Sequence, residues 1–309
     1  MNKENSSVIY SAIICLGFIA LILWIFFNAA LGNEVPEKQK EISVILYSAG
    51  TGSWESFQEG IKQAENDFSV NINIVMLREE ADAAEQLEIM QREVENGAEA
   101  LAVAVIDYEE LYERMLQAPV SVPIVSVESG FNDMLPLISA DNYEMGKRLG
   151  EEILKEFSDE KELTVAIANE TILRDSVEKR KKGLLDALDG KAKIITLRAA
   201  ANGEGADAAV ALHKESLLHL SEKDNQALSR TKYYGIGNTA SVVAALDQGK
   251  IDKLIFQNEF NMGYLAIKTL IREMNGIQSK ETEHIDFYCV SREELYGTQY
   301  EQLLFPIVK

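Results

Sequence analysis

The stretch Gly235-Ile236-Gly237-Asn238-Thr239-Ala240 has the spacing of a phosphate-binding turn. In a Gly-x-Gly-x-x-Ala turn the glycines let the backbone approach a pyrophosphate, and the helix that follows directs its amides at the phosphates. That turn belongs to a first βαβ unit, whereas here it comes late, and Glu259 stands only loosely where a ribose-binding acid is expected. A tight turn from a strand into a helix is the simpler interpretation, and a nucleotide-dependent enzyme is the alternative.

Other patterns of catalytic and metal-binding residues are missing from the sequence. It has no Gly-x-Ser-x-Gly, no P-loop and no Cys-x-x-Cys. Of the three histidines, His213 and His219 are six positions apart, so they fall on different faces of a predicted helix and cannot chelate a metal together. We expect surface positions for both, and a lone position for His284. The chain is therefore expected to have no catalytic residues, no metal and no cofactor.

The net charge of −20 and the isoelectric point near 4.6 restrict the partners. Nucleic-acid binding needs clustered Lys and Arg to meet phosphates, so we exclude this class. The acidic side chains are expected to cover solvated helix faces. Cys15 lies in an apolar run and Cys289 in a strand-like stretch, so no disulfide is expected.

The apolar run of residues 8–27 has the length of a membrane span. It contains no charge, and a helix of about 20 residues rises about 30 Å, the thickness of the hydrocarbon core. Signal-peptide cores are shorter, about 7–15 residues. We predict a single-pass membrane anchor within residues 1–33, with the remainder extracytoplasmic because Lys3 precedes the span. Cleavage near Gly32, which would release a secreted protein, is the alternative.

After a polar stalk of residues 34–41, strand-like and helical segments alternate. Strands are predicted at residues 42–47, 70–76, 101–106, 124–127, 136–139, 163–168, 193–197, 232–236, 254–257 and 285–290. Between them the apolar residues have helical spacing, and residues 206–220 are predicted to be one of these helices. This alternation predicts an α/β protein with parallel sheets, whose ligand binds beyond the carboxyl ends of the strands.

Several short motifs occur in an order known from one family. They are Ser126-Val127-Glu128, Ile138-Ser139-Ala140-Asp141-Asn142-Tyr143-Glu144-Met145-Gly146, Arg180-Lys181-Lys182-Gly183-Leu184, Asp247-Gln248-Gly249-Lys250-Ile251, Leu254-Ile255-Phe256-Gln257-Asn258 and Gly263-Tyr264-Leu265-Ala266. Over residues 42–300 this order resembles the ribose- and galactose-type periplasmic sugar-binding proteins, whose type I periplasmic-binding fold is shared with LacI-type repressors. No helix-turn-helix precedes the resemblance, and the apolar run stands in its place, so a repressor is not expected.

The resemblance implies two lobes with a ligand between them. Lobe 1 would comprise residues 42–140 and 258–283, and lobe 2 residues 141–257 and 284–309. The ligand-binding positions that it implies are Trp54, Asp107, Glu128, Arg180, Gly237 and Gln257.

These residue types suit a sugar, because aromatic rings pack on its C–H faces and planar polar groups meet its hydroxyls. For three of these residues, a role that involves no ligand remains the alternative. Trp54 would cap its own helix against the core, Arg180 would be a solvated helix residue, and Asp107 would be a helix N-cap.

The chain also departs from the family pattern. Ser129 stands where ribose binders carry an arginine, and Gly237 where they carry an aspartate. The interval from Gly183 to Gly235 is short by about one strand–helix pair, and the polar residues 221–231 do not supply it. We therefore expect the second lobe to lack one strand, with a helix and a loop at 221–231 and weakened ligand binding.

The function that these features favour is a membrane-tethered solute-binding protein for a sugar or related small molecule, which feeds an ABC permease. A ligand-sensing partner of a membrane sensor histidine kinase is the alternative within the same fold. The identity of the ligand is not encoded in any motif that we recognise.

Overall fold

The computed structural model describes residues 16–24, 39–47, 53–78, 81–130, 135–160, 162–168, 174–197, 205–222, 231–277, 283–297, 300, 303 and 304. The chain divides into two compact units, residues 1–39 and 40–309. In the first unit residues 16–24 are helical. Most of the predicted span, the cleavage position near Gly32 and residues 34–38 of the stalk lie outside the described residues. Among the helices that are described, none has the length and apolar character to cross a membrane.

The second unit alternates strands and helices. Its strands are β1 (Glu41–Leu46), β2 (Asn71–Met76), β3 (Ala100–Val103), β4 (Ile124–Val127), β5 (Leu137–Ala140), β6 (Leu163–Ala168), β7 (Ala192–Leu197), β8 (Ala208–Ala211), β9 (Lys232–Ile236), β10 (Lys253–Gln257), β11 (Glu283–Ile285) and β12 (Phe287–Ser291). Its helices are α2 (Glu55–Phe68), α3 (Ala83–Glu95), α4 (Tyr108–Gln117), α5 (Asn142–Glu156), α6 (Asp175–Leu188), α7 (Lys214–Glu222), α8 (Ala240–Asp247) and α9 (Glu259–Met274).

The strands form two six-stranded sheets. The first sheet has the order β11-β5-β4-β3-β1-β2 and the second has the order β12-β10-β9-β8-β6-β7. All pairings are parallel except β10 with β12. The prediction of an α/β protein with parallel sheets is confirmed.

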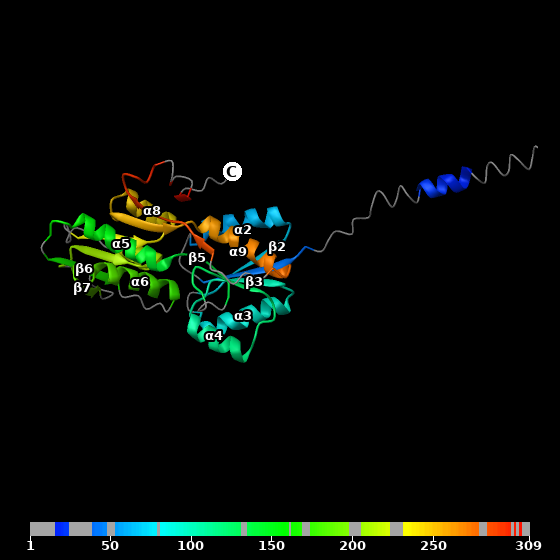
Figure 1. Ribbon diagram of the computed structural model, residues 1–309, viewed down its shortest axis with the longest axis horizontal. Coiled ribbons are helices and arrows are strands. Elements are labelled where there is room, and N and C mark those ends of the chain that lie inside the picture. The colour runs from blue at the N-terminus through cyan, green and yellow to red at the C-terminus, as the bar shows by residue number, and fades with distance from the viewer. Residues whose placement is uncertain are drawn as a thin grey trace, which may run out of the picture. The chain divides into compact units, whose positions relative to one another are not determined.

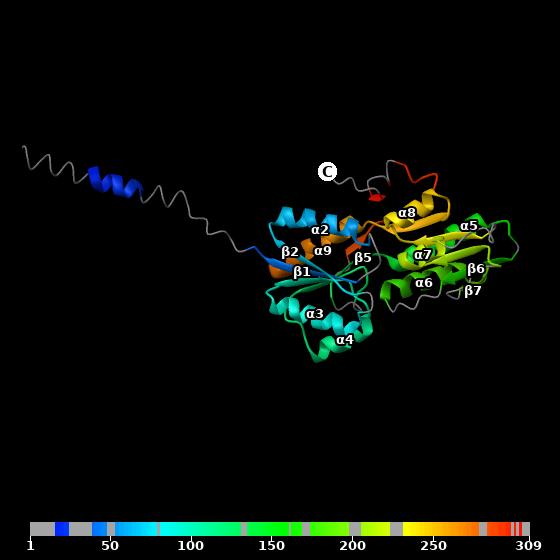
Figure 2. The same ribbon diagram turned by 180° about the vertical axis from the view of Figure 1, so that it is seen from behind.

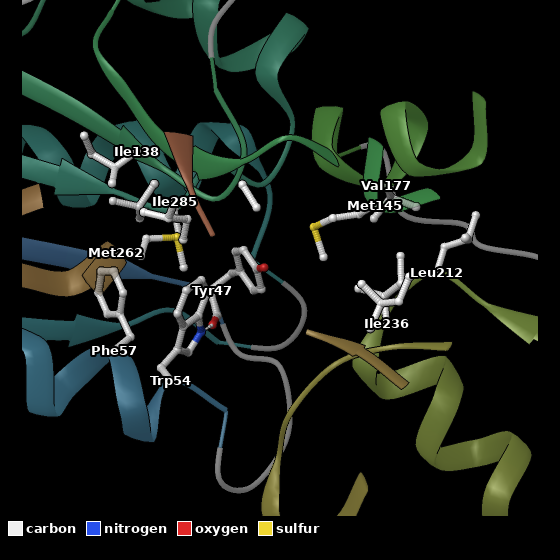
Figure 3. Close-up of a cluster of buried hydrophobic side chains, with 14 of the residues drawn as sticks. Tyr47, Trp54, Phe57, Ile138, Met145, Val177, Leu212, Ile236, Met262 and Ile285 are labelled. Atoms are coloured by element: carbon white, nitrogen blue, oxygen red, sulfur yellow. Dashed lines mark hydrogen bonds between the residues drawn. The ribbon is translucent and has the colours of Figure 1, made fainter. Parts of the chain in front are cut away.

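Helices cover both faces of each sheet, as parallel sheets require. In the first sheet α2 and α9 lie side by side on one face and α3 and α4 on the other (Figures 1 and 2). In the second sheet α5 and α6 pack on one face, and α7 and α8 on the other. One buried cluster runs from the α2–α9 face of the first sheet to the α5–α6 face of the second (Figure 3).

Glycines allow the helix pair α5–α6 to cross at backbone contact. A Cβ on Gly146 of α5 would lie 2.6 Å from the carbonyl carbon of Arg180 on α6, and one on Gly183 would lie 2.8 Å from the amide of Lys147. Ordinary contacts of a Cβ begin at 3.4 Å, so no side chain fits at either position. This crossing fixes where Arg180 stands relative to the first turn of α5.

The expectation that the second lobe lacks a strand is wrong. Residues 208–211, which we predicted to be helical, form β8, and this strand pairs with β6 and β9. Alternate residues of β8 are fully buried on opposite faces of the sheet, Ala208 and Val210 on one and Ala209 and Ala211 on the other. Alanine has the highest helix propensity, and burial on both faces overrides it here.

The stretch 221–231 is not where the sheet gains its strand. Residues 221 and 222 end α7, and residues 223–230 lie outside the described part. The helix expected over 206–220 therefore starts later, at Lys214, and the second sheet has its full set of six strands.

The last predicted strand, residues 285–290, is in fact two strands. The chain passes from the first sheet to the second at Asp286, because β11 pairs with β5 whereas β12 pairs with β10. Two further passages between the sheets lie between β5 and β6 and between β10 and β11. The lobe boundaries that the family resemblance implies remain a prediction.

Candidate ligand-binding site between the two sheets

Polar side chains from both sheets meet beyond the carboxyl ends of the strands. A small cavity of about 20 Å³ lies at this meeting point. Its lining comprises Glu128, Arg180, His213, Lys214, Ile236, Gly237, Asn238, Phe256, Gln257 and Glu259. Most lining residues end or closely follow β4, β8, β9 and β10. Lys214 and Glu259 begin α7 and α9, and Arg180 comes from α6.

Glu128 is at the centre of the polar cluster. It follows β4 with a positive φ of 63°, a conformation that is costly for a non-glycine residue and that often occurs at functional sites. One carboxylate oxygen accepts a hydrogen bond from the Tyr47 hydroxyl at 2.6 Å, and the other accepts one from Arg180 Nη2 at 3.0 Å. Burial raises the pKa of the Glu128 carboxyl, but Arg180, Arg174 and the Tyr47 hydroxyl lower it more, so the net shift is downward.

Arg180 uses its whole guanidinium to join the two sheets. In addition to Glu128, it donates from Nε to Asn142 Oδ1 at 2.7 Å and from Nη1 to the Leu212 carbonyl oxygen at 3.2 Å. Its side chain is only 3% exposed, so the alternative of a solvated helix arginine is wrong. We expected the planar guanidinium group to face ligand hydroxyl groups, but in this structure it donates its hydrogen bonds to protein acceptors.

Asn142 and Gln257 hold the passages between the sheets together. Asn142, the first residue of α5, donates from Nδ2 to Ser139 Oγ at 2.9 Å and to the Glu128 carbonyl oxygen at 3.3 Å. Gln257 ends β10, and its Oε1 accepts from the backbone amide of Ala140 at 3.4 Å. Two of the three segments that pass between the sheets are thus linked to each other next to the cavity.

A second basic group lies beside this cluster. Arg174 precedes α6, and its guanidinium carbon lies 3.5 Å from the centre of the Tyr47 ring. Its Nη1 lies 2.5 Å from Nε2 of His213, and Nδ1 of His213 lies 3.2 Å from a carboxylate oxygen of Glu215. Burial and the neighbouring cations Arg174, Lys214 and Arg180 lower the pKa of His213 well below its usual value. The imidazole is therefore neutral, and Nε2 accepts a hydrogen bond from Arg174.

Our expectation that His213 lies on the surface is wrong. It is 1% exposed because it follows the strand β8 rather than lying within a helix, whereas His219 on α7 is exposed as expected. The misassigned strand is the cause, since His213 lies just beyond the carboxyl end of β8, where the ligand cleft of such a sheet lies.

Lys214 and Gly237 lie close to each other in the lining of the cavity. The Lys214 ammonium lies 3.6 Å from a carboxylate oxygen of Glu259 and 4.6 Å from the centre of the Trp54 ring. A Cβ on Gly237 would lie 2.8 Å from the Lys214 Cβ. The position where the family carries an aspartate therefore has no room for any side chain in this chain.

Trp54 lies inside the core rather than on the cavity surface. It is 1% exposed, its Nε1 donates to the Tyr47 carbonyl oxygen at 3.0 Å, and its ring packs edge-on against Tyr47 and Phe57 (Figure 3). This arrangement matches the alternative in which Trp54 caps its helix against the core. A left-handed backbone conformation, φ 74°, turns the chain into α2 at this residue.

Asp107 also has a structural role, the helix N-cap that the sequence left open as the alternative to ligand binding. Its carboxylate accepts from the amides of Glu109 and Glu110, which makes it the N-cap of α4, and it is not among the residues that line the cavity. Four of the predicted positions, Glu128, Arg180, Gly237 and Gln257, do line the cavity.

Besides Asn238 and Glu259 in the cavity lining, the sequence interpretation missed five polar residues of the surrounding cluster. They are Tyr47, Asn142, Arg174, His213 and Lys214. The available signal was position, since Tyr47, His213 and Lys214 stand just beyond strand ends. Within the described residues no group of His, Cys, Asp and Glu is arranged to hold a metal ion.

The chain is similar to known proteins over most of its length. A D-ribose/D-allose-binding protein of Pseudomonas aeruginosa is 20% identical over 92% of this chain and 95% of its own length. A carbohydrate transporter solute-binding protein from Agrobacterium radiobacter, solved with D-arabinose, superposes with a TM-score of 0.78 at 19% identity. That alignment covers 87% of this chain and 99% of the solved chain.

A glucose–galactose-binding protein from Geobacillus stearothermophilus has the same fold, with a TM-score of 0.72 at 15% identity over 84% of this chain and 100% of its own. These relatives are named as binding proteins, and the prediction that the chain is not an enzyme is confirmed. A family profile described as a periplasmic binding protein domain matches residues 42–214, more than half of the sequence. The chain belongs to the periplasmic binding protein family, as its motifs predicted, and has its type I fold.

Proposed function

We propose that this chain is an extracytoplasmic solute-binding protein that binds a sugar or related polyol between its two sheets. The apolar run of residues 8–27 tethers it to the membrane, and the bound solute passes to an ABC permease. Support comes from the relatives: two are named as binding proteins for ribose and allose or for glucose and galactose, and a carbohydrate transporter solute-binding protein was solved with D-arabinose. It comes also from the apolar run, which has the length of a membrane span.

The observation that carries the proposal is the polar cluster that joins the two sheets. Glu128 and Tyr47 belong to the first sheet, and Arg180 and Asn142 belong to helices of the second. Carboxylate, guanidinium and amide groups in one buried site are the hydrogen-bonding partners that adjacent hydroxyl groups require. A ligand that replaced these mutual contacts would hold the two lobes together in the same way.

Ligand entry requires motion. The cavity of about 20 Å³ holds little more than one water molecule, whereas pockets for small ligands measure about 300–1,000 Å³. The space is taken by the side chains of Arg180, Lys214 and Glu128 themselves. We propose that the lobes hinge apart at the three passages between the sheets, which lie at residues 140–142, 257–258 and 285–287.

The tether also supports a second partner for the same binding activity. An anchor that is not cleaved keeps the folded unit next to the membrane, which suits a contact with the extracellular part of a sensor histidine kinase. Purification of the full-length protein from its own membranes, followed by identification of the co-purified protein, decides between a permease and a kinase.

Isothermal titration calorimetry on the full-length protein in detergent tests the binding function. We expect at least one pentose, hexose or sugar acid of a panel to bind, and Arg180→Met to weaken that binding by about 10-fold or more, since hydrogen bonds to charged groups are lost. Arg148→Met is the matched control, because Arg148 is half exposed and pairs with Glu152 on α5. No binding of any panel member at millimolar concentration, or equal affinity of Arg180→Met and the wild type, would contradict the proposal.

A further inference from the structure

Arg174 is a buried cation without a carboxylate partner. Arg174 is 6% exposed. Among the described residues, no Asp or Glu oxygen lies 4.0 Å or less from its guanidinium nitrogens. The contacts that it makes are to a ring and to a neutral imidazole, Tyr47 and His213. Its Nε is buried and has no hydrogen-bond partner.

The other two buried cations at the site are paired. Arg180 lies 3.0 Å from Glu128, and Lys214 lies 3.6 Å from Glu259. These two pairs cancel within the site, and the neutral His213 adds no charge. Among the described buried cations of this cluster, Arg174 is therefore the one without a carboxylate in contact with it.

Burial of an unpaired charge is costly, so such groups are normally paired or ligated. The cation–π contact with Tyr47 offsets only a part of that cost. Two carboxylates act on Arg174 without contacting it: Glu215 lies against His213, and Glu128, whose pKa Arg174 helps to lower, pairs with Arg180. Ser176, in the first turn of α6, is fully buried, and its hydroxyl has no hydrogen-bond partner. The amino end of a helix also favours an anion.

We propose that the physiological ligand is a sugar acid, a polyol with one carboxylate, whose carboxylate pairs with Arg174. This inference rests on the proposed binding function and narrows it. A guanidinium binds a carboxylate through two parallel N–H···O bonds, and the free Nε of Arg174 provides one of these donors. A single carboxylate matches the single charge of Arg174, whereas a phosphate monoester would bring about −1.5 to −2. The hydroxyl groups of the ligand would face Glu128, Asn142 and Arg180.

A purely structural role is the competing explanation for Arg174. Stacking on Tyr47 joins α6 to the first sheet, and this contact alone would help hold the two lobes closed. The two explanations differ in one respect. A structural arginine favours acidic and neutral ligands equally, whereas a ligand-binding arginine favours the acidic ligand of each pair.

The test compares matched ligands on the full-length protein in detergent. Calorimetric titrations use galactose against galacturonate, glucose against gluconate and glucuronate, and ribose against ribonate. We expect one sugar acid to bind at least about 10-fold more tightly than its neutral counterpart, as for a charge-assisted pair. Arg174→Gln should reduce that ratio to about 1, and Arg174→Lys should leave an intermediate ratio, since the charge remains but the fork is lost.

Lys179→Gln is the matched control, since Lys179 lies on the same helix, is half exposed and pairs with Asp175. It should leave the ratio of affinities unchanged. A neutral sugar that binds as tightly as its acid overturns the sugar-acid inference and leaves the binding function intact. The absence of binding across the whole panel overturns both. If Arg174→Gln does not fold, the ratio measured on the wild type still decides.

Discussion

Substitution of Gly146 by alanine tests how the helix crossing positions Arg180. The added Cβ would lie 2.6 Å from the carbonyl carbon of Arg180, whereas ordinary contact begins at 3.4 Å. The helices α5 and α6 must therefore separate by at least 0.8 Å, the difference between 3.4 and 2.6 Å. The bond from Arg180 Nε to Asn142 Oδ1, now 2.7 Å, joins these two helices and would lengthen by a similar amount.

The expected cost follows from three contributions. Overpacking against backbone costs about 1–3 kcal/mol, and weakened hydrogen bonds of a buried charged group cost about 1.5–3 kcal/mol. Alanine gains about 1 kcal/mol over glycine in a helix. We therefore expect Gly146→Ala to lower the free energy of unfolding by about 1.5–5 kcal/mol and to weaken ligand binding as well.

Urea unfolding followed by tryptophan fluorescence measures this change. The chain has two tryptophans, so a Trp24→Phe background leaves the buried Trp54 as the only reporter. Gly263→Ala is the control, because its Cβ would press on the backbone of Phe57 at the α2–α9 crossing, away from Arg180. It should reduce stability but leave the Arg180-dependent part of ligand affinity intact. A Gly146→Ala protein within about 1 kcal/mol of the wild type, or one with unchanged affinity, would refute this account of the crossing.

Two further predictions concern the buried cluster. Glu128→Gln should lower the free energy of unfolding by about 3–5 kcal/mol at neutral pH, since it leaves Arg180 buried without its counter-charge. The pKa of Glu128 is lowered from 4.5 in the folded state, so this difference should be full above pH 4.5 and shrink as the pH falls through the lower folded pKa. Denaturant titrations across this range check it, and a difference that does not depend on pH would show that the carboxylate charge is unimportant. Trp54→Ala should cost about 3–5 kcal/mol, because a fully buried indole is removed. If Trp54→Ala weakened ligand binding without lowering the stability, Trp54 would be a ligand-contacting residue and not a core residue.

The fold was largely predictable because most strands carry a strong local signal. Strands such as β1, β4 and β6 are runs of β-branched and other apolar residues that burial on both faces of a parallel sheet demands. The strand β8 has the sequence Ala-Ala-Val-Ala, whose local preference is helical. Only its place between β6 and β9 makes it a strand, and this tertiary contribution is not visible in a local pattern.

The site was predictable in part, and mostly through the family resemblance. Glu128, Arg180, Gly237 and Gln257 line the cavity as that resemblance implied, although their contacts with a ligand remain a prediction. The error at β8 placed its successors, His213 and Lys214, within a helix and so concealed them. Arg174 precedes α6 and carries no pattern of its own, and its significance comes only from burial and from the absence, among the described residues, of a carboxylate in contact with it.

Asp107 illustrates a further limit. A polar residue after a parallel strand stands both at the cleft edge and at the start of a helix, and the two roles use the same carboxylate oxygens. The Asp107 carboxylate accepts hydrogen bonds from two backbone amides of α4 and so caps the start of this helix. Residue type and position are identical for both roles, so only the direction of the side chain distinguishes them.

Hydrogen–deuterium exchange of the full-length protein, with and without the tightest-binding member of the sugar and sugar-acid panel, tests the central claim most directly. That claim is that the ligand binds where the two sheets meet. The account predicts that ligand slows exchange in segments of both lobes that line the site, residues 126–130, 174–181, 212–215 and 236–239. Slower exchange confined to one lobe, or located around the separate pocket formed by Lys232, Lys253 and Arg292, would contradict it.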